Sequence, residues 1–343
     1  MFEDKERQEI ESVGKYPLIQ KLSEKLEFTH AETLCGIGED AAVVKVTEGV
    51  GTHVSRLFLE YVHFDLTYFP LRHLGYKCAA VAMSGLVAMN VIPSHLRLNI
   101  AVSNRFSVEA MEELMTGVRM CCRRYGVDIV GLDIGSSLTG MAISTDAFGF
   151  AQESDIVMRK GAGEKELICV SGDLGAAYAG LLILEREKQV FEANSQMQPD
   201  LEGFDYLLER QLKPEPRVDI IKLLKSKAIQ PTAMTNVDEG LAGALSNICR
   251  ASDKGCVIYE EKLPIDILAF NTLKELKIVA TTVALSGGED YELLFTIKQD
   301  DFDKINTMEN ISVIGYIQEP SAGENLITND EKVVELKTMG GKQ

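Results

Sequence analysis

The chain has 343 residues, of which 45% are hydrophobic and 25% are charged, an ordinary composition for a folded protein that buries its own cores. This length exceeds what one hydrophobic core usually serves, so we expect two domains. Asp and Glu number 52 against 35 Lys and Arg, and the resulting net charge of −17 repels a phosphate backbone and argues against nucleic-acid binding.

The cysteines and the amino-terminal stretch bear on where the protein works. Seven cysteines stand at scattered positions without a CxxC pair, which favours unpaired thiols in a reducing compartment. The opening MFEDKERQEIES is charged and lacks the apolar segment of a signal peptide. The longest apolar run, residues 78–93, is shorter than the roughly 20 residues of a membrane helix. We therefore expect a cytoplasmic protein with no membrane segment.

The first elements are a charged helix within residues 1–30 and then the segment GIGEDAAVVKV, residues 36–46. Glycine permits a tight turn, and the adjacent carboxylates Glu39 and Asp40, placed before a strand, have the oxygen atoms that hold a hard cation. The alternative is an ordinary polar turn before a strand. The residues alone leave both interpretations open.

The segment from residue 59 to residue 93 is the centre of the first half. Aromatic and β-branched residues predict a strand over residues 59–64, and residues 74–89 predict a helix that is apolar on nearly every face and therefore buried. His63 and Asp65 lie between them, where a site is often found beside a core element. For His63 a core histidine is the alternative.

The next elements carry clear end signals. Residues 96–104 alternate as a strand, and Ser107 is expected to cap an amphipathic helix that ends at Gly126. The stretch VDIVGLDIGSS places Asp133 in a glycine-flanked turn at a strand end, and residues 141–152 follow as another strand. The charged stretch 153–163, which contains Arg159, is the predicted domain boundary.

The second half opens with a strand, a glycine-rich turn at Gly172 and Gly175, and a long helix. This arrangement is a generic anion cradle, although packing glycines explain it equally well. Asp238 and Glu239 are expected at the start of a later helix. The segment ALSGGEDYELLFTI, residues 284–297, contains two glycines and three carboxylates immediately before and at the start of a predicted strand.

Together these segments resemble the thiamine-monophosphate kinase family, within the superfamily of aminoimidazole ribonucleotide synthetase, selenophosphate synthetase and HypE. The resemblance runs collinearly through GIGEDAAVV, EYVHFDLTYFPLRHLGYK, GLDIGSS, VMRKGAG, SGDLGAAYAGL and SGGEDYELLFT. It implies an α/β (α+β) fold of two domains. Residues 1–155 would bind ATP and metal and dimerise through their sheet, and residues 156–343 would form an α/β sandwich.

The same resemblance implies direct in-line transfer of the γ-phosphoryl group of ATP to thiamine monophosphate, with Mg²⁺, in a homodimer and without a covalent intermediate. It implies metal ligands at Glu39, Asp40, Asp133 and Asp238. ATP contacts are implied at Gly131, Asp133, Arg159 and Asp238, and substrate contacts at His63, Asp65, Glu289, Asp290 and Tyr291.

Several positions depart from the family pattern. Arg56, Gly85 and Asn236 stand where the family has aspartates, a fourth aspartate is Glu239, and the carboxy-terminal Gly-Trp is matched by Gly340 and Gly341 in a chain without tryptophan. Arg56 either supplies positive charge to a phosphate or pairs with Glu39 or Asp40 and fills an emptied metal site. Accordingly, the chain is either a kinase of this family or a catalytically impaired paralogue that serves as a binding or regulatory protein.

Overall fold

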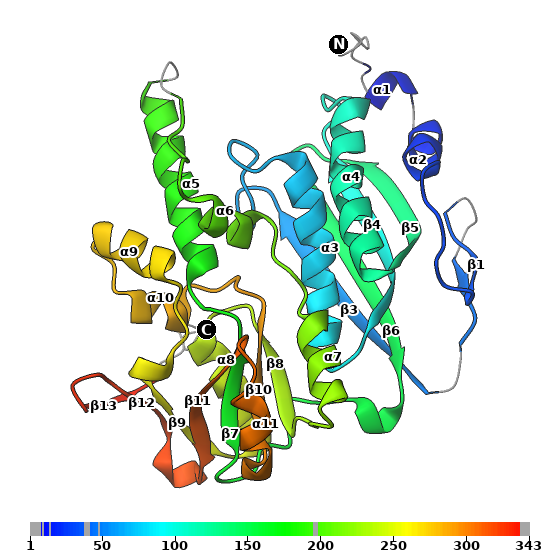
Figure 1. Ribbon diagram of the computed structural model, residues 1–343. Helices are drawn as coiled ribbons and strands as arrows, with labels where there is room; N and C mark the ends of the chain where they lie inside the picture. Colours follow the sequence, from blue (N-terminus) through cyan, green and yellow to red (C-terminus); the bar gives the residue numbers. More distant parts are fainter. Residues whose placement is uncertain are drawn as a thin grey trace. The chain divides into compact units, whose positions relative to one another are not determined.

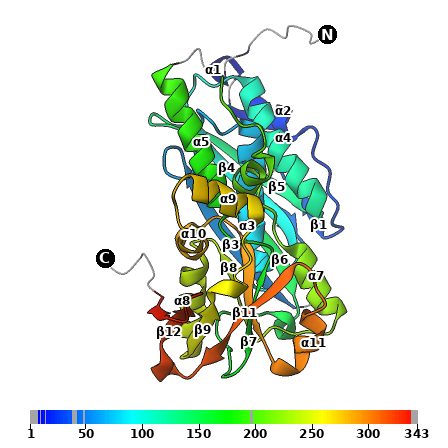
Figure 2. The ribbon, with the colours of Figure 1, turned by 60° about the vertical axis from the view of Figure 1, so that its left-hand side comes forward.

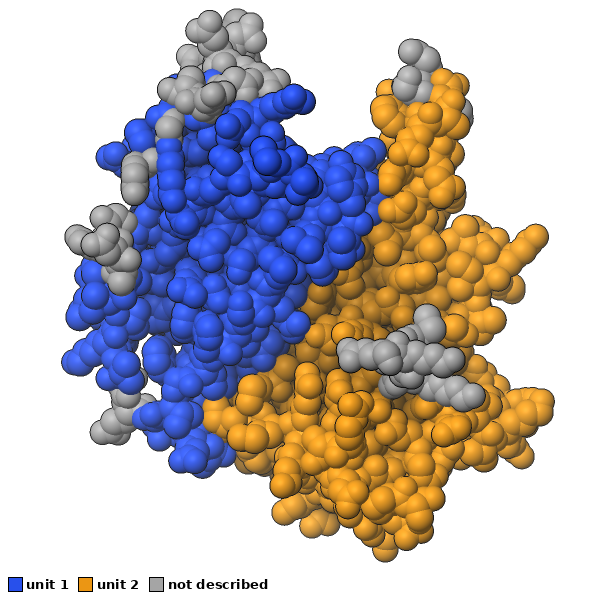
Figure 3. Space-filling model, turned by 180° about the vertical axis from the view of Figure 1, so that it is seen from behind, with its two compact units in different colours: residues 1–86, 91–155 blue, residues 87–90, 156–343 orange. Residues whose placement is uncertain are grey.

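The computed structural model describes residues 8, 10–13, 15–37, 42–46, 49–194 and 198–336. The chain divides into two compact units, which Figure 3 colours separately. Unit 1 comprises residues 1–86 and 91–155, and unit 2 comprises residues 87–90 and 156–343. Both units combine helices with a β-sheet, so the predicted α/β class is confirmed.

Unit 1 is built on a four-stranded sheet in the order β3-β6-β4-β5, in which β4 and β5 are parallel and the other pairs antiparallel. Helices α3 and α4 lie on one face of this sheet (Figures 1 and 2). The elements are α1 (Ile10–Val13), α2 (Lys15–Ser23), β1 (Thr33–Cys35), β2 (Val43–Val44), β3 (Val50–Leu59), α3 (Leu71–Val87), β4 (Pro93–Val102), α4 (Val108–Tyr125), β5 (Asp128–Ser136) and β6 (Ala142–Ala151).

Helices α3 and α4 of unit 1 form as the sequence predicts. Ser107 accepts a hydrogen bond from the backbone N–H of Ala110, and Gly126 ends α4 in a left-handed conformation. Helix α3 is buried along most of its length, as its apolar composition predicts. The strand predicted over residues 59–64 is wrong, because β3 ends at Leu59 and the chain then turns through Tyr61 at φ 66°.

Two glycines allow α3 and α4 to pack closely. A Cβ added at Gly117 would lie 1.8 Å from the Arg72 carbonyl oxygen, and one added at Gly75 would lie 2.0 Å from the Leu114 carbonyl oxygen. These neighbours are backbone atoms, which cannot rotate away as a flexible side chain does. The close approach therefore requires glycine at both positions.

We expect Gly117→Ala to lower the free energy of unfolding of unit 1 by about 2 kcal/mol, because the two helices must move apart. Urea denaturation followed by circular dichroism measures the change. Gly135→Ala is the matched control, since an added Cβ there meets nothing within 4 Å. A loss as small for Gly117→Ala as for the control would contradict the close packing of α3 on α4.

Unit 2 contains a seven-stranded mixed sheet in the order β13-β12-β9-β11-β7-β10-β8. Its core lies between this sheet and helix α8 and includes Ile168, Val237, Leu245 and Leu294. The elements are β7 (Leu167–Ser171), α5 (Ala176–Ala193), α6 (Asp205–Leu212), α7 (Val218–Ser226), β8 (Ala233–Val237), α8 (Leu241–Ser252), β9 (Gly255–Tyr259), α9 (Ile267–Glu275), α10 (Ala280–Ser286), β10 (Glu292–Ile297), α11 (Phe302–Ile305), β11 (Ile311–Gln318), β12 (Glu324–Ile327) and β13 (Val333–Glu335).

None of the helices in the described part of the chain combines the length and apolarity needed to cross a bilayer.

Candidate functional site

Unit 1 contains a cavity of about 760 Å³ against one face of its sheet. Gly131 and Asp133 of β5 line it, and both were predicted to bind ATP. Asp133 does not lie in a turn as predicted, because β5 continues past it to Ser136 in parallel pairing with β4. The other lining residues come from α2, the β1–β2 segment, β4, β5 and β6: Lys15, Ile19, Gly36, Ile37, Ala42, Val44, His95, Arg97, Leu98, Asn99, Val130, Leu132, Phe148 and Phe150.

Among the described residues that line this cavity, Asp133 is the one with an acidic side chain. Its side chain is 60% exposed, and its Oδ1 lies 2.6 Å from the Lys15 ammonium nitrogen. Glu39 and Asp40, the other metal ligands expected in this half, lie outside the described residues, as do Gly340 and Gly341. No group of three or more His, Cys, Asp or Glu side chains placed to hold a metal ion occurs within residues 8–336 as far as they are described.

A buried carboxylate anchors the segment that leads to residues 38–41. Asp128 accepts hydrogen bonds from the Thr29 backbone N–H (2.6 Å), the Thr29 hydroxyl (2.8 Å), the His30 backbone N–H (3.1 Å) and the Thr33 hydroxyl (2.5 Å). Thr33 Oγ1 also lies 2.9 Å from His95 Nε2. Burial opposes ionisation of Asp128, but these donors outweigh it and lower its pKa.

His63 and Asp65 lie in the turn that follows β3. His63 is exposed, which excludes the core-histidine interpretation, and its Nδ1 accepts the Leu59 backbone N–H at 3.0 Å. Asp65 is buried and its Oδ1 accepts the Thr67 backbone N–H at 2.8 Å. The turn therefore presents the imidazole of His63 to solvent and uses Asp65 to stabilise its own backbone.

Two of the departing positions lie in regular elements of unit 1. Arg56 lies inside β3, opposite Thr145 of β6. Gly85 lies in α3, and a Cβ added there would be 2.9 Å from Cγ1 of Val54. An aspartate at position 85 would therefore require Val54 to move, so the glycine suits the contact between α3 and β3.

In unit 2 the structure brings together two motifs that are about 50 residues apart in the sequence. The Glu289 backbone N–H donates to the Asp238 carbonyl at 2.8 Å, and the Tyr291 N–H donates to the Val237 carbonyl at 2.9 Å. Arg159 donates through Nε to Thr235 Oγ1 at 3.1 Å, at the same strand β8. The predicted ATP contact Asp238 thus lies beside the predicted substrate turn, and Arg159 lies against the strand that leads to Asp238.

The local structure around Asp238 differs from the prediction in one respect. Helix α8 begins at Leu241 after Gly240, so Asp238 and Glu239 precede the helix instead of starting it. Asn236, at the end of β8, is 5% exposed, and neither polar atom of its amide has a hydrogen-bond partner among the described residues. A buried polar group without a partner is unfavourable, which makes Asn236 a ligand-facing candidate.

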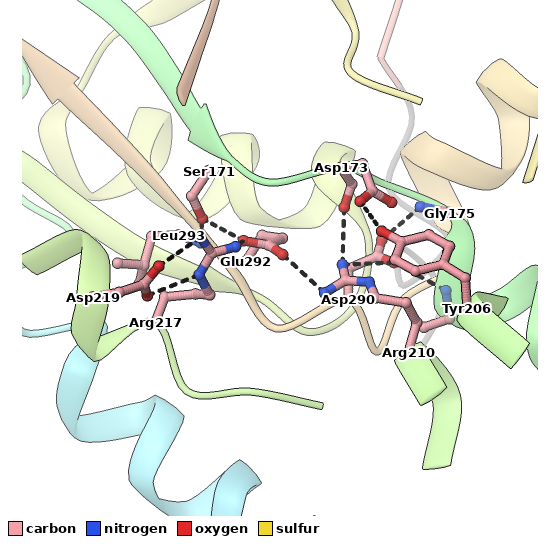
Figure 4. Close-up of polar contacts among 11 residues, drawn as sticks. Ser171, Asp173, Gly175, Tyr206, Arg210, Arg217, Asp219, Asp290, Glu292 and Leu293 are labelled. Atoms are coloured by element: carbon pink, nitrogen blue, oxygen red, sulfur yellow. Dashed lines mark hydrogen bonds and ion pairs between the residues drawn. The ribbon is translucent and has the colours of Figure 1, made fainter. Parts of the chain in front are cut away.

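The glycine-rich turn before α5 holds a carboxyl group that belongs to the chain itself. Asp290 Oδ2 accepts the Gly175 backbone N–H at 2.9 Å, and its Oδ1 accepts that of Ala177 at 3.4 Å (Figure 4). The Asp290 side chain is 0% exposed, so the direct substrate contact predicted for it does not fit this structure. Burial raises the pKa of Asp290 to about 7, although Arg210 and the two N–H groups oppose this.

Sequence reasoning missed a buried ion network next to Asp290. Glu292 lies between two arginines, with Oε1 2.9 Å from Arg210 Nη1 and Oε2 2.6 Å from Arg217 Nη1 (Figure 4). The Ser171 hydroxyl donates to the same Oε2 at 2.5 Å. The available signal was a carboxylate at the start of the apolar strand β10 and two arginines in the polar stretch before α7.

Comparisons with known proteins extend over nearly the whole chain. Residues 38–151 match the family described as AIR synthase related protein, N-terminal domain. Over 317 residues the chain is 28% identical to the thiamine-monophosphate kinase of Bacillus subtilis (strain 168), which covers 91% of this chain and 94% of that relative.

Solved structures agree with this relationship. The crystal structure of thiamine-monophosphate kinase from Stenotrophomonas maltophilia K279a superposes with a TM-score of 0.75 at 26% identity, over 91% of this chain and 95% of that one. The structure of AaThiL complexed with AMPPCP and TMP superposes with a TM-score of 0.73 at 27% identity, over 95% and 96%. Residues 38–151 are thus similar to the AIR synthase related proteins, and nearly the whole chain is similar to the thiamine-monophosphate kinases.

Proposed function

We propose that this chain transfers the γ-phosphoryl group of ATP to thiamine monophosphate and so produces thiamine diphosphate and ADP. The observation that carries the proposal is the full-length likeness to a structure that holds AMPPCP and TMP together, at 27% identity over 95% of this chain. A likeness of this length includes both units and therefore both sets of candidate residues.

The candidate residues come from both units. In unit 1, Gly131 and Asp133 line a cavity whose volume of about 760 Å³ suits a nucleotide-sized ligand. In unit 2, Arg159 lies against strand β8, and Asp238, which follows that strand, lies beside Glu289. We propose that the first four contact ATP, and that Glu289 and Tyr291 contact thiamine monophosphate together with His63 and Asp65.

In this reaction the protein has mainly to position the two substrates and to neutralise their charge. Two anions must be brought into line, and the transferred group passes directly between them, so no side chain needs to form a covalent bond. Arg159 would neutralise charge on the phosphates. The −17 net charge of the chain makes such local positive groups necessary.

We propose that Mg²⁺ accompanies the nucleotide. Mg²⁺ is often held by one or two carboxylates plus substrate phosphates, and Asp133 and Asp238 fit this need. In the structure the Asp133 carboxylate forms an ion pair with the Lys15 ammonium at 2.6 Å, which the metal ion would have to displace. Glu39 and Asp40 are further proposed ligands. When bound, the ion would neutralise charge on the phosphate oxygens.

We also propose a homodimer formed through the sheet of unit 1, and a cytoplasmic location. The sheet leaves His53, Ser55 and Leu57 of β3 exposed, and Leu57 is an apolar side chain with 56% exposure. Such exposure suits a surface that another copy covers.

The proposed cytoplasmic location is supported by the cysteines. All seven are free thiols, which suits a reducing compartment.

The test is turnover of the purified chain with ATP, thiamine monophosphate and MgCl₂. We expect ADP and thiamine diphosphate in equal amounts, measured by anion-exchange chromatography. Nucleotide binding without turnover would support the binding or regulatory alternative, and an absence of nucleotide binding at millimolar concentration would overturn both.

Replacing Arg159 by methionine is expected to lower kcat/KM by about 10²-fold, because one charged donor to the phosphates is lost. The matched control is Arg250→Met, which removes an exposed arginine in the last turn of α8. Equal rates for the two variants would show that Arg159 does not act on the transferred phosphate.

A further inference from the structure

Helix α6 contacts the turn over residues 287–291 through two neighbouring side chains. Gln211 is 3% exposed, and its Nε2 donates to Oε2 of Glu289 at 2.9 Å. Arg210 lies with Nη2 3.9 Å from Oδ1 of Asp290 and with Nη1 2.9 Å from Oε1 of Glu292. Consecutive helical residues point about 100° apart, so these two side chains reach different residues of the turn.

Helix α6 is itself a rigid support. It packs on α5 so closely that a Cβ added at Gly180 would lie 2.1 Å from the Leu207 carbonyl oxygen. Arg210 also donates through Nη2 to the Asp173 carbonyl at 3.0 Å, and Tyr206 donates to the Asp173 carboxylate (Figure 4). Residues near both ends of α6 therefore bond the loop that precedes α5.

Asp290 holds the same turn from the side of α5. Its carboxylate accepts the backbone N–H groups of Gly175 and Ala177 at the start of that helix. A carboxylate at a helix N-terminus interacts favourably with the unpaired N–H groups and the helix dipole. The turn is thus docked between two helices that pack on each other.

The backbone of the turn needs such support. Glu289 and Tyr291 have φ angles of 62° and 52°, in the left-handed region that non-glycine residues seldom adopt. Conformations of this kind persist where the surrounding structure over-determines them, and they cluster at functional sites. Hydrogen bonds, a helix N-terminus and two α6 side chains supply that restraint here.

From this geometry we propose that Gln211, Arg210 and Asp290 are positioning residues, which fix the carboxylate of Glu289 for contact with the phosphate acceptor. The inference rests on the proposed function and deepens it, because it names the residues that orient one substrate contact. Glu289 is the only one of these groups proposed to contact the substrate.

The decisive variant is Gln211→Met, which keeps a long unbranched side chain and removes the hydrogen bond to Glu289. We expect the Kd for thiamine monophosphate, measured by calorimetry, to rise about tenfold, the effect of losing one hydrogen bond to a charged group. The Kd for a non-hydrolysable ATP analogue should change less than twofold. A general structural defect would weaken both ligands alike, and that result would overturn the proposal.

The matched control is Gln299→Met, which removes a glutamine whose Nε2 bonds the Lys165 carbonyl. It should leave both Kd values unchanged. Hydrogen exchange of a peptide spanning residues 285–293 gives a readout that needs no ligand, and we expect faster exchange in Gln211→Met only. Unchanged exchange in that variant would overturn the positioning role even if the chain proved to bind no thiamine monophosphate.

Asp290→Asn provides an independent check should Gln211→Met fold poorly. The amide keeps the shape of the side chain but has only one acceptor oxygen for the two N–H groups of α5. We expect about a threefold rise in the Kd for thiamine monophosphate, again with little change for the ATP analogue. Equal Kd values for variant and wild type would show that Asp290 is not a positioning residue.

Discussion

Replacing Glu292 by glutamine is expected to lower the free energy of unfolding by about 3–5 kcal/mol, the usual cost of removing one partner from a buried ion pair. Glu292 has a side chain that is 1% exposed, and Arg210 and Arg217 on either side of it are each 13% exposed. Glutamine has the same shape but no charge, so both guanidinium groups would keep their burial and lose their shared counter-charge. The loss comes from the missing Glu292 charge, although Arg217 keeps its ion pair with Asp219 and Arg210 keeps that with Asp290.

The measurement is urea denaturation, with hydrogen exchange of peptides from residues 156–336 used to follow unit 2 separately. Glu209→Gln is the matched control, because Glu209 forms an ion pair with Lys213 but is 59% exposed. Exposed pairs of this kind contribute about 0–1 kcal/mol. A loss below about 1 kcal/mol for Glu292→Gln would mean that Asp173, Asp219 and Asp290 already neutralise the arginines.

Asp128→Asn should lower the free energy of unfolding of unit 1 by about 3 kcal/mol at pH 7, because several charge-assisted hydrogen bonds are weakened at once. Asp128 is 0% exposed, and both of its oxygens accept donors from residues 29–33. An amide has only one acceptor oxygen and would turn its NH₂ group toward two of these donors. The segment leading to Glu39 and Asp40 would lose its anchor, so we also expect weaker metal-dependent nucleotide binding.

The effect of Asp128→Asn should depend on pH in a defined direction. The donors lower the pKa of Asp128 in the folded state, so the ionised carboxylate stabilises the fold above its unfolded pKa of about 4. This contribution is lost as the pH falls through the lowered folded value, and the difference between variant and wild type should shrink there. Glu113→Gln, at a 50% exposed partner of Arg72, is the control. A pH-independent difference would contradict an ionised Asp128.

Much of the fold was predictable because its signals are local. Helix α4 has its cap at Ser107, its apolar stripe and its stop at Gly126 within one continuous stretch. The buried α3 follows in the same way from composition alone. Motif order likewise predicted the similarity to the thiamine-monophosphate kinases, which the comparison with the Bacillus subtilis enzyme confirms over 91% of the chain.

The errors occurred where pairing partners decide the structure. Residues 59–64 have strand-forming side chains, yet β3 is paired with β6 over Val50–Leu59 and the chain turns directly afterwards. Asp133 is flanked by glycines, yet pairing with Asn99 of β4 keeps it inside β5. In both places a tertiary hydrogen-bonded ladder overrides the local preference.

The sequence by itself therefore predicted helices α3 and α4 and the resemblance to the thiamine-monophosphate kinases, and it proposed Arg159, Asp238 and Glu289 as candidate positions. Only the tertiary structure decided that the glycine-rich turn before α5 holds Asp290, and that Glu292 is neutralised by arginines 75 and 82 residues earlier in the chain. A charge in an apolar strand is stable only if its counter-charge lies beside it in space. No local pattern encodes that neighbour, because Arg210 of α6 and Arg217 before α7 reach Glu292 only in the folded chain.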